Sequence, residues 1–400
     1  LFPLYSHQTK SVNLVRVGKN VVVVTPTASG KTLCYNLPVL DTILTQKGCR
    51  ALYLFPTKAL AQDQLRSLRE LTIEQKIKLN YSTFDGDTPQ NERGAIKRSA
   101  EIVLSNPDMV HVGIMPNHSA WKEFFSRLRY VVIDEAHVYR GVVGSHVANV
   151  VRRLRRLCAY YGSSPQFILC TATIANPQEH VERLTGLPCE VVAEDGSPHG
   201  GKEFVFWNPP IIDEAKSARR SPNSEATLLL TELMRKNIRS LAFTRSRRLT
   251  ELIYMYVRDQ LAKDAPKLVD KVKPYRAGYM AEDRRQIERE LFDGKLLAAV
   301  ATTALELGVD IGDLDATILT GYPGSIASTW QQAGRSGRGK EDSISFLIGL
   351  DNPLDQYLMR HPEFFFGKSH ENALINPDNL HILKPHVLCA AWEMPLTNSD

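Results

Sequence analysis

Several features that would place the chain in a specialised class are missing from its sequence. No apolar run approaches the roughly 18–20 residues needed to span a bilayer, and the first residues lack the charged and apolar regions of a signal peptide. The six cysteines are scattered without a C-x-x-C pair, which argues against both a zinc site and a disulfide framework. We therefore expect no membrane segment and a reducing, intracellular setting.

The chain also lacks a strong charge bias and an initiator Met. Its net charge of +5 is only a weak indication of a polyanionic partner, since many metabolic enzymes carry as much. A length of 400 residues suits two domains of about 150–200 residues with a remainder. Because the sequence begins with Leu1, we expect it to be a piece of a longer protein.

One stretch of β-branched and small residues carries the clearest chemical signal. Val21–Val24 has the composition of a strand buried on both faces, and Gly30-Lys31-Thr32 opens a segment that can continue as a helix. Backbone N–H groups at a helix N-terminus favour an anion, so a triphosphate can lie there with Lys31 at its β/γ end. Thr25 replaces the first glycine of the G-x-x-x-x-G-K-[ST] pattern, which leaves an ordinary strand-to-helix turn as the alternative. The predicted ATP site comprises Thr27, Ala28, Ser29, Gly30, Lys31 and Thr32, with the Thr32 hydroxyl on Mg²⁺.

Apolar strands alternate with helical stretches, which predicts an α/β fold with parallel sheets whose ligands lie at the carboxyl ends of strands. The predicted strands are 21–24, 51–55, 102–105, 130–133, 167–170, 204–207, 240–243, 273–275, 298–301 and 316–319. A Gly- and Pro-rich segment, Glu194 to Ser224, separates the halves, and the rhythm stops near Pro353. We predict domains at 1–195 and 196–352, and the start of a further domain at 353–400.

Two acidic residues directly follow the strand predicted at 130–133. Asp134 can hold Mg²⁺ through its waters, and Glu135 is placed to polarise an attacking water as a general base. Without a phosphate site nearby, they would be two solvated acids at a strand end. His137 is either a structural histidine or, as we favour, a polar link from the nucleotide site to the second domain.

The second half has its most specific segment at Gln331–Arg338. Arg335 and Arg338 are three residues apart, so on a helix they share a face and can bind phosphate oxygens bidentately. Supplied from another domain, they would act as arginine fingers. A bare R-x-x-R pair would instead be a solvated basic face, but glycines are costly in a plain surface helix and indicate close backbone approach here.

Taken together, in this order and spacing, the motifs resemble those of superfamily 2 helicases. The segments Gly30-Lys31-Thr32, Asp134-Glu135-Ala136-His137, Thr171-Ala172-Thr173 and Gln331–Arg338 look like motifs I, II, III and VI. Residues 8, 55–60, 86–87, 106–108, 241–246 and 301–312 look like the Q motif and motifs Ia, Ib, Ic, IV and V. The resemblance covers residues 1 to about 350 and implies two tandem RecA-like domains that bind ATP, Mg²⁺ and a nucleic-acid strand.

The resemblance also assigns tasks to individual residues. Gln8, which offers both a donor and an acceptor to the adenine edge, would bind ATP together with Gly308 and Asp310. The catalytic set would be Lys31, Asp134, Glu135, His137, Gln331, Arg335 and Arg338, with Thr32 and Asp134 on Mg²⁺ and with Thr171 and Thr173 coupling hydrolysis to movement. The residues that would contact the sugar-phosphate backbone of the nucleic acid are Thr57, Lys58, Gly86, Asn106, Thr244, Arg245, Ser246, Thr302 and Thr303. Such contacts fix register without reading sequence.

Four longer stretches, 4–8, 23–36, 304–312 and 362–379, resemble the bacterial mitomycin repair factor A group, a relative of the RecQ-like repair helicases of eukaryotes. This resemblance implies a 3′→5′ DNA helicase of genome maintenance that acts on single-stranded or tailed duplex DNA. We expect a monomer in the cytoplasm, at the nucleoid, with repair proteins such as a nuclease as partners. The family's four zinc-binding cysteines are not found in the chain, so we expect the motor and the start of a winged-helix region.

Two other functions remain open from the sequence. A DExH RNA helicase would share the motor motifs, since phosphate contacts do not distinguish ribose from deoxyribose. A double-strand DNA translocase that never unwinds would keep them too.

Outside the motifs, a solvated helix face is favoured over a nucleic-acid track for Arg152, Arg153, Arg155 and Arg156. Packing is favoured over stacking on bases for Trp121, Trp207, Trp330 and Trp392.

Overall fold

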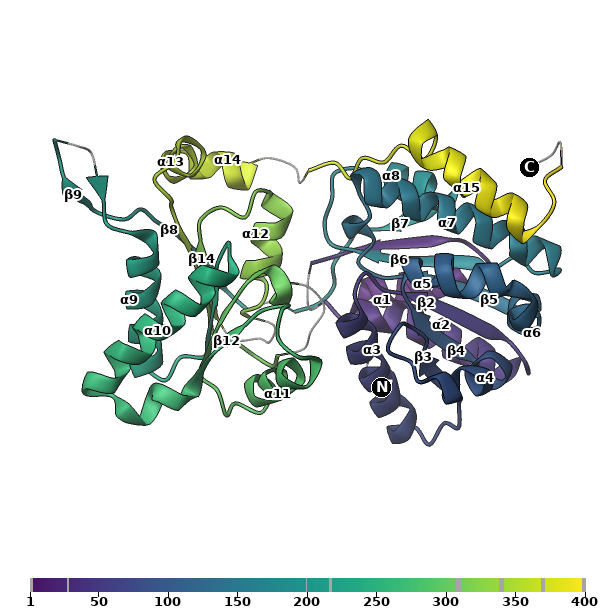
Figure 1. Ribbon diagram of the computed structural model, residues 1–400, viewed down its shortest axis with the longest axis horizontal. Coiled ribbons are helices and arrows are strands. Elements are labelled where there is room, and N and C mark those ends of the chain that lie inside the picture. Colours follow the sequence, from purple (N-terminus) through teal and green to yellow (C-terminus); the bar gives the residue numbers. More distant parts are fainter. Residues whose placement is uncertain are drawn as a thin grey trace. The chain divides into compact units, whose positions relative to one another are not determined.

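The computed structural model describes residues 3–26, 29–198, 200–215, 218–306, 311–337, 342–367 and 371–397. The chain forms two compact units, of which the first combines Leu1–Ser197 with Asn372–Asp400 and the second is Pro198–Glu371. Figure 1 shows a sheet flanked by helices in each unit. The predicted α/β class with two parallel-sheet domains is therefore confirmed.

The first unit is built on a parallel sheet with strand order β3-β4-β2-β5-β6-β1-β7. Alternate side chains of a strand point to opposite faces, so Val22 and Val24 of β1 enter one core while Val21 and Val23 enter the other. The sheet is thus buried on both sides, as the run of valines predicted. Its strands are β1 (Val21–Val24), β2 (Arg50–Leu54), β3 (Tyr81–Thr83), β4 (Ile102–Ser105), β5 (Leu128–Ile133), β6 (Gln166–Thr171) and β7 (Glu190–Val192).

Helices cover both faces of this sheet. The core on one face includes side chains of α1 (Ser6–Arg16), α2 (Lys31–Thr45) and α3 (Lys58–Glu74). The opposite core includes side chains of α4 (Gln90–Ser99), α6 (Lys122–Ser126), α7 (Gly141–Tyr160) and α8 (Pro177–Thr185). Shorter helical segments are α5 (Pro107–Met109), Val110–Ile114, Met115–Trp121 and Ala136–Val138. Every helix in the described residues is too short or too polar to cross a lipid bilayer.

The second unit repeats this plan around a parallel sheet ordered β12-β13-β11-β14-β15-β8. The strands are β8 (Lys202–Trp207), β11 (Ser240–Phe243), β12 (Val272–Tyr275), β13 (Ala298–Ala301), β14 (Ala316–Thr320) and β15 (Ser343–Ile348), with β9 (Ile211–Asp213) and β10 (Ala218–Arg219) as a separate antiparallel pair. The helical segments are α9 (Pro222–Arg235), α10 (Arg247–Asp264), Pro266–Lys271, α11 (Ala281–Phe292), Thr303–Leu305, α12 (Ile326–Ala333), α13 (Pro353–Arg360) and α14 (Pro362–Gly367). The sequence did not reveal β3, β7, β9, β10 or β15.

The segment 353–400, predicted as the start of a further domain, is divided between the units. α13 and α14 belong to the second unit, whereas α15 (Leu380–Glu393) belongs to the first and packs on α7. Figure 1 shows α15, in yellow, lying along α7. The described part of 353–400 is helical, and its predicted winged-helix character stays a prediction.

Arginines of α7 hold α15 in place. Arg153 is 5% exposed and pairs with Glu393, with its Nε 3.1 Å from Oε2 and its Nη2 on the other oxygen. Arg156 donates to the carbonyls of Ala390 and Met394 at 3.0 and 3.2 Å, where the end of a helix leaves acceptors without partners. The predicted solvated face is therefore wrong for Arg153 and Arg156, because helix docking occupies their guanidinium groups.

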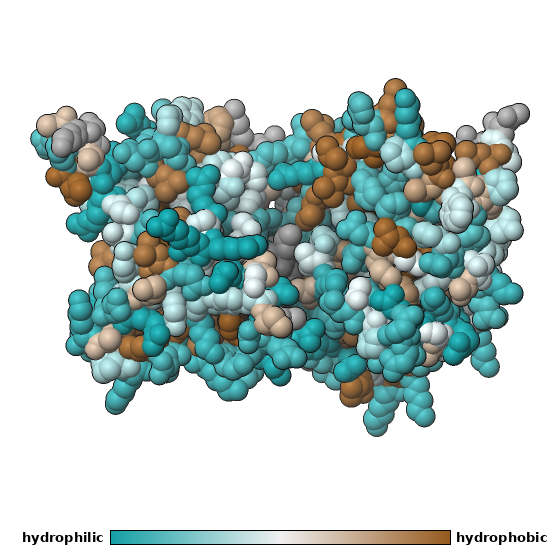
Figure 2. Space-filling view, viewed as in Figure 1, coloured by the Kyte–Doolittle hydropathy of each residue, from teal (hydrophilic) through white to brown (hydrophobic). Residues whose placement is uncertain are grey.

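The outward side of α15 carries large apolar side chains next to the exposed His381 and Lys384. Leu380, Leu388 and Trp392 are exposed there, Trp392 at 81%, and Figure 2 shows hydrophobic residues over the part of this face where Figure 1 draws α15. The packing predicted for the tryptophans holds for fully buried Trp121 and for Trp330, which packs against Phe204. It holds also for Trp207, which packs against Phe346, whereas for the exposed Trp392 packing at an interface stays a prediction.

His111, His146 and His386 lie around the buried ion pair of Arg153 and Glu393. The Nδ1 atoms of His111 and His386 are 2.9 and 3.1 Å from Arg153 Nη1, and His386 Nε2 is 2.9 Å from His146 Nδ1. A guanidinium can only donate, so both Nδ1 atoms that face it accept and carry no proton. Burial lowers the pKa of His386 to about 3, assisted by His146 and Arg153, and burial also lowers the pKa of His111 and His146.

We expect the docking of α15 to weaken as pH falls below about 6.5, the ordinary pKa of histidine. The pKa of His386 is lower in the folded chain than in the unfolded chain, so the unfolded state binds the extra proton and stability is lost as pH falls toward the folded value. Amide hydrogen exchange, corrected for intrinsic rates, should show falling protection in α15 relative to β1. His386→Asn keeps an acceptor near Arg153 but does not titrate, so its protection should depend less on pH. An equal pH dependence in His386→Asn and in the control His381→Asn, at an exposed position of α15, would contradict this.

Candidate functional site

The polar clusters of the first unit lie along one edge of its sheet. The consecutive strands β5, β6 and β1 lead into Asp134–Glu135, Thr171 and the turn before α2. The consecutive strands β3, β4 and β2 lead toward Gly86, Asn106 and Thr57–Lys58. Parallel β-strands end at the same edge of a sheet, so all these residues lie along one edge. One half of that edge carries the predicted ATP-binding residues, and the other half carries the residues predicted to contact nucleic acid.

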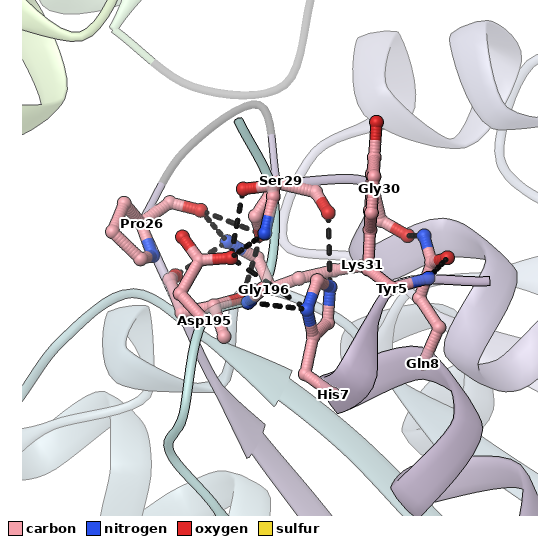
Figure 3. Close-up of polar contacts among 11 residues, drawn as sticks. Tyr5, His7, Gln8, Pro26, Ser29, Gly30, Lys31, Asp195 and Gly196 are labelled. Carbon is pink, nitrogen blue, oxygen red and sulfur yellow. Dashed lines mark hydrogen bonds and ion pairs between the residues drawn. The ribbon is translucent and has the colours of Figure 1, made fainter. Parts of the chain in front are cut away.

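The described residues of the turn before α2, 25–26 and 29–30, carry features of a phosphate loop. Gly30 has a φ of 77°, in the left-handed region that glycine adopts most easily, and Lys31 begins the helix. The Lys31 ammonium donates to the carbonyls of Thr25 and Pro26 at 2.7 and 2.6 Å (Figure 3). Thr25 Oγ1 lies 2.6 Å from Ser29 Oγ, so the threonine that replaces the first glycine ties the two ends of the loop together.

Gln8 fastens this loop to α1. Its Nε2 donates to the Gly30 carbonyl at 3.0 Å, and its Oε1 accepts from the Tyr5 N–H at 3.0 Å. A Cβ added to Gly30 would lie 2.7 Å from Gln8 Nε2 at the end of a flexible side chain, so the positive φ is the main reason for glycine there. A carboxamide has two N–H groups and two acceptor sites. These bonds use one of each, and the predicted contact of Gln8 with the edge of adenine stays a prediction.

Asp134 and Glu135 form a strained acidic pair at the end of β5. Asp134 Oδ1 accepts from the Glu135 N–H at 2.9 Å, and its Oδ2 lies 3.2 Å from the Tyr35 hydroxyl. Burial, together with the neighbouring Glu135, raises the pKa of Asp134. Glu135 has a φ of 50°, which is rare outside glycine and is concentrated at functional sites. Tyr35 was missed by the sequence analysis, although it lies one helical turn beyond Lys31 and Thr32.

The acidic pair fits a hydrated cation. Glu135 Oε2 is buried and has no hydrogen-bond partner among the described residues. The nearest ring nitrogen, His137 Nδ1 at 3.5 Å, accepts from the Ala172 N–H at 3.1 Å and therefore has no proton to give. No group of three or more His, Cys, Asp or Glu that could ligate a metal occurs in the described part of the chain. One carboxylate with phosphate and water is the usual arrangement for Mg²⁺.

His137 joins the acidic segment to the end of β6. It is buried, and burial lowers its pKa, so it is neutral and accepts from Ala172. Thr171 is also buried and donates to the Ala172 carbonyl at 2.9 Å. His180 on α8, which no motif marked, supports the segment with its Nε2 3.0 Å from the Ala136 carbonyl. The observed contact of His137 lies within the first unit, and its predicted link to the second domain stays a prediction.

The residues of the first unit that are predicted to contact nucleic acid lie at the half of the edge formed by β3, β4 and β2. Lys58 Nζ lies 2.9 Å from Asp87 Oδ1, and a Cβ on Gly86 would lie 3.2 Å from the same ammonium. This ion pair is solvent-exposed and therefore weak, so a phosphate can compete for Lys58. The side chains of Thr57 and Asn106 cap α3 and α5, which fixes the positions at which the chain turns along this half.

In the second unit, the residues predicted to contact nucleic acid come directly after the neighbouring β-strands β13 and β11. Arg245, Ser246 and Thr303 are exposed, and Thr302 is partly exposed. Thr244 differs from the prediction because its side chain is 4% exposed, with its Oγ1 2.7 Å from Thr250 Oγ1. Thr244 therefore orders the turn after β11 from inside the unit, since its hydroxyl points into the core.

Arg335 is held inside the second unit by a main-chain carbonyl. Its Nε and Nη2 donate to the Glu306 carbonyl at 3.1 and 2.6 Å, while the Glu306 carboxylate accepts from Ser328 and Gln332 at 2.6 and 2.8 Å. Gln331 is buried on the same helix, α12. Glu306 was not predicted from the sequence, because every residue has a main-chain carbonyl and a motif cannot show which carbonyl will accept a hydrogen bond. The predicted site residues that lie outside the described residues are Thr27, Ala28, Gly308, Asp310 and Arg338.

Comparison with known proteins agrees with this arrangement. Residues 5–181 match the DEAD/DEAH box helicase family, and residues 225–340 match the helicase conserved C-terminal domain. The uncharacterized ATP-dependent helicase YprA of Bacillus subtilis is 50% identical over 392 residues, which cover 98% of this chain and 52% of that protein. The ATP-dependent helicase HRQ1 of Saccharomyces cerevisiae is 42% identical over 402 residues, which cover 98% of this chain and 37% of that protein.

A solved structure extends the likeness to the fold. The crystal structure of the DUF1998 helicase MrfA bound to DNA matches with a TM-score of 0.95 at 49% identity, over 99% of this chain and 53% of that chain. The chain spans about half or less of the length of these relatives. With its two helicase domains in sequence and its phosphate loop and acidic pair on one sheet edge, the chain belongs to the superfamily 2 helicases of the DEAD/DEAH box type.

Proposed function

We propose that the chain is the motor of an ATP-dependent DNA helicase or translocase. The observation that carries the proposal is the shared sheet edge on which Lys31, Asp134 and Glu135 lie, with a buried oxygen of Glu135 in need of a partner. Phosphoryl transfer from ATP requires positioning and charge neutralisation more than covalent chemistry. DNA as the polymer is supported by MrfA, whose structures at 49% identity are of complexes with DNA and with DNA and AMPPNP.

Each side chain of the site has a task in hydrolysis. The Lys31 ammonium would exchange the neutral carbonyls of Thr25 and Pro26 for charged phosphate oxygens, which are the stronger acceptors. Thr32 and Asp134 would hold Mg²⁺, whose charge neutralises the phosphate oxygens. Glu135, with its unpartnered oxygen, would take a proton from the attacking water. His137 fixes the neighbouring backbone through Ala172 and so keeps this pair oriented.

We further propose that the motor moves 3′→5′ along single-stranded or tailed duplex DNA in DNA repair. This finer statement rests on the resemblance to the mitomycin repair factor A group. Lys58, at the start of α3 in the first unit, and Arg245, in the turn after β11 in the second, are exposed cations, and contacts of this kind bind phosphate without reading bases. We propose a monomer in the cytoplasm, at the nucleoid, with repair proteins such as a nuclease as partners.

The proposal is tested by ATP hydrolysis without nucleic acid, with single-stranded DNA and with RNA of matched length, at low salt. Stimulation by DNA well above that by RNA is expected, and 3′-tailed duplexes should then be unwound in preference to 5′-tailed ones. Equal or greater stimulation by RNA would replace the proposal with an RNA helicase. Stimulation by blunt duplex without strand separation would replace it with a double-strand translocase.

Lys31→Ala is expected to lower ATP affinity by about tenfold or more, since a hydrogen bond to a charged group contributes roughly 1.5–3 kcal/mol. Equilibrium binding of a fluorescent ATP analogue measures the loss. Lys10→Ala, which removes an exposed lysine of α1, serves as the control and should bind like the wild type. Wild-type affinity in Lys31→Ala would remove this lysine from the phosphate site.

Glu135→Gln should keep ATP binding and lower the turnover number by about 10²–10⁴-fold, the usual contribution of a general base. Single-turnover hydrolysis separates the two effects. The exposed Glu123→Gln variant is the control for loss of one negative charge. Normal turnover in Glu135→Gln would show that another group activates the water.

A further inference from the structure

One buried imidazole touches both the phosphate loop and the segment through which the chain leaves the first unit. His7 of α1 is fully buried, with its Nε2 2.9 Å from the Ser29 carbonyl. The Gly196 N–H donates to His7 Nδ1 at 3.3 Å (Figure 3). An amide N–H can only donate, so Nδ1 accepts and the ring proton resides on Nε2, which donates to Ser29. The two ring nitrogens thus face different partners, the Ser29 carbonyl at Nε2 and, at Nδ1, the Gly196 N–H with Asp195 Oδ1 3.6 Å away.

The exit segment Asp195–Ser197 is fitted to the start of α1. Ser197 donates through its N–H and its hydroxyl to Asp195 Oδ1 at 2.9 and 2.7 Å, which closes a tight turn around Gly196. A Cβ on Gly196 would overlap Ser6 Oγ and would lie 2.9 Å from the Ser6 nitrogen, so glycine permits the approach to α1. The chain passes into the second unit directly after this turn, between Ser197 and Pro198.

The phosphate loop is fastened at the same point. Ser29 is fully buried, and its carbonyl belongs to the peptide whose N–H comes from Gly30, the residue that precedes Lys31. A hydrogen bond that fixes this carbonyl therefore also fixes the direction of the Gly30 N–H, one of the groups that face a bound phosphate in such loops. Any rotation of this peptide on binding phosphate changes the bond that His7 makes.

We propose that His7 is a positioning residue that couples the state of the phosphate loop to the exit segment Asp195–Ser197. The coupling rests on the proposed ATP-driven motor and deepens it. It runs through two hydrogen bonds of one rigid ring, from the Ser29 carbonyl to Nε2 and from Nδ1 to the Gly196 N–H. Gln8, the neighbouring residue, donates to the Gly30 carbonyl of the loop and accepts from the Tyr5 N–H at the start of α1.

Two amide substitutions separate the two bonds of His7. The Nε2 of glutamine occupies about the position of the imidazole Nε2, so His7→Gln keeps a donor toward Ser29 and loses the acceptor for Gly196. The Oδ1 of asparagine occupies about the position of Nδ1, so His7→Asn keeps the acceptor and loses the donor. His7→Ala removes both, and His381→Ala, at an exposed position of α15, is the matched control.

The experiment measures kcat and KM for ATP with and without single-stranded DNA, together with Tm, for all four variants and the wild type. The KM for ATP should rise in His7→Asn and His7→Ala but not in His7→Gln. The ratio of DNA-stimulated to basal kcat should fall by about fivefold or more in all three His7 variants, the lower end of typical coupling between sites. His381→Ala should match the wild type.

A wild-type stimulation ratio in His7→Gln or His7→Asn would overturn the coupling while leaving the motor intact. Equal losses of Tm, basal kcat and stimulated kcat in all three variants would also overturn it, because a merely structural histidine gives that pattern. Absence of DNA stimulation in the wild type would defeat the proposed motor and the coupling with it. The failures of the two proposals are therefore distinguishable.

Discussion

Burial of both sheets on their two faces is the constraint on which the other features depend. Strands such as β1, with four fully or nearly fully buried valines, leave no room for polar side chains along their length. Charged groups collect where a strand ends and the chain turns into a helix, whereas buried hydroxyls inside a sheet, such as Thr317 and Ser345, bond to each other at 2.8 Å. Parallel pairing brings those ends to one edge, so the site follows from the way the core is made.

The cost of this arrangement is visible in the acidic pair. Asp134 and the nearby Glu135 oxygen are buried, and Lys31 offsets this only in part because the pKa of Asp134 stays raised. Burial of a charge is unfavourable unless it is paired. Glu135 also holds a left-handed backbone conformation. Strain and unsatisfied charge in one turn mark a site kept for a ligand, since neither would improve the stability of the folded chain.

The sequence predicted most of the fold because strand periodicity is a local property. The bounds of β1, β4 and β11 match the predicted ones, whereas β3 and β7 are three-residue edge strands with too few residues for a pattern. β15 was missed although Ser343-Ile344-Ser345-Phe346 alternates as a strand should. This short alternating stretch lies a few residues after Arg338, and the segment was interpreted only as part of the arginine motif.

The residues of the candidate site were predicted from the identity of their side chains, but the contacts that hold these side chains in place could not be predicted from the sequence. Lys31 on Thr25 and Arg335 on Glu306 are contacts with main-chain carbonyls, which every residue has and no sequence letter distinguishes. The burial of Thr244 and the clasp of Arg153 on Glu393 depend on segments brought together by the tertiary fold. Such contacts join residues up to 240 positions apart.

The return of α15 to the first unit changes the topology of the motor. The second unit, Pro198–Glu371, is inserted into the sequence of the first, so two covalent connections join the units where a simple tandem arrangement would have one. Moving the units apart would therefore extend two segments of chain at once, which costs more conformational entropy than extending one. On the first unit, Gly196 lies at the base of one connection and Arg153 holds α15 beyond the other.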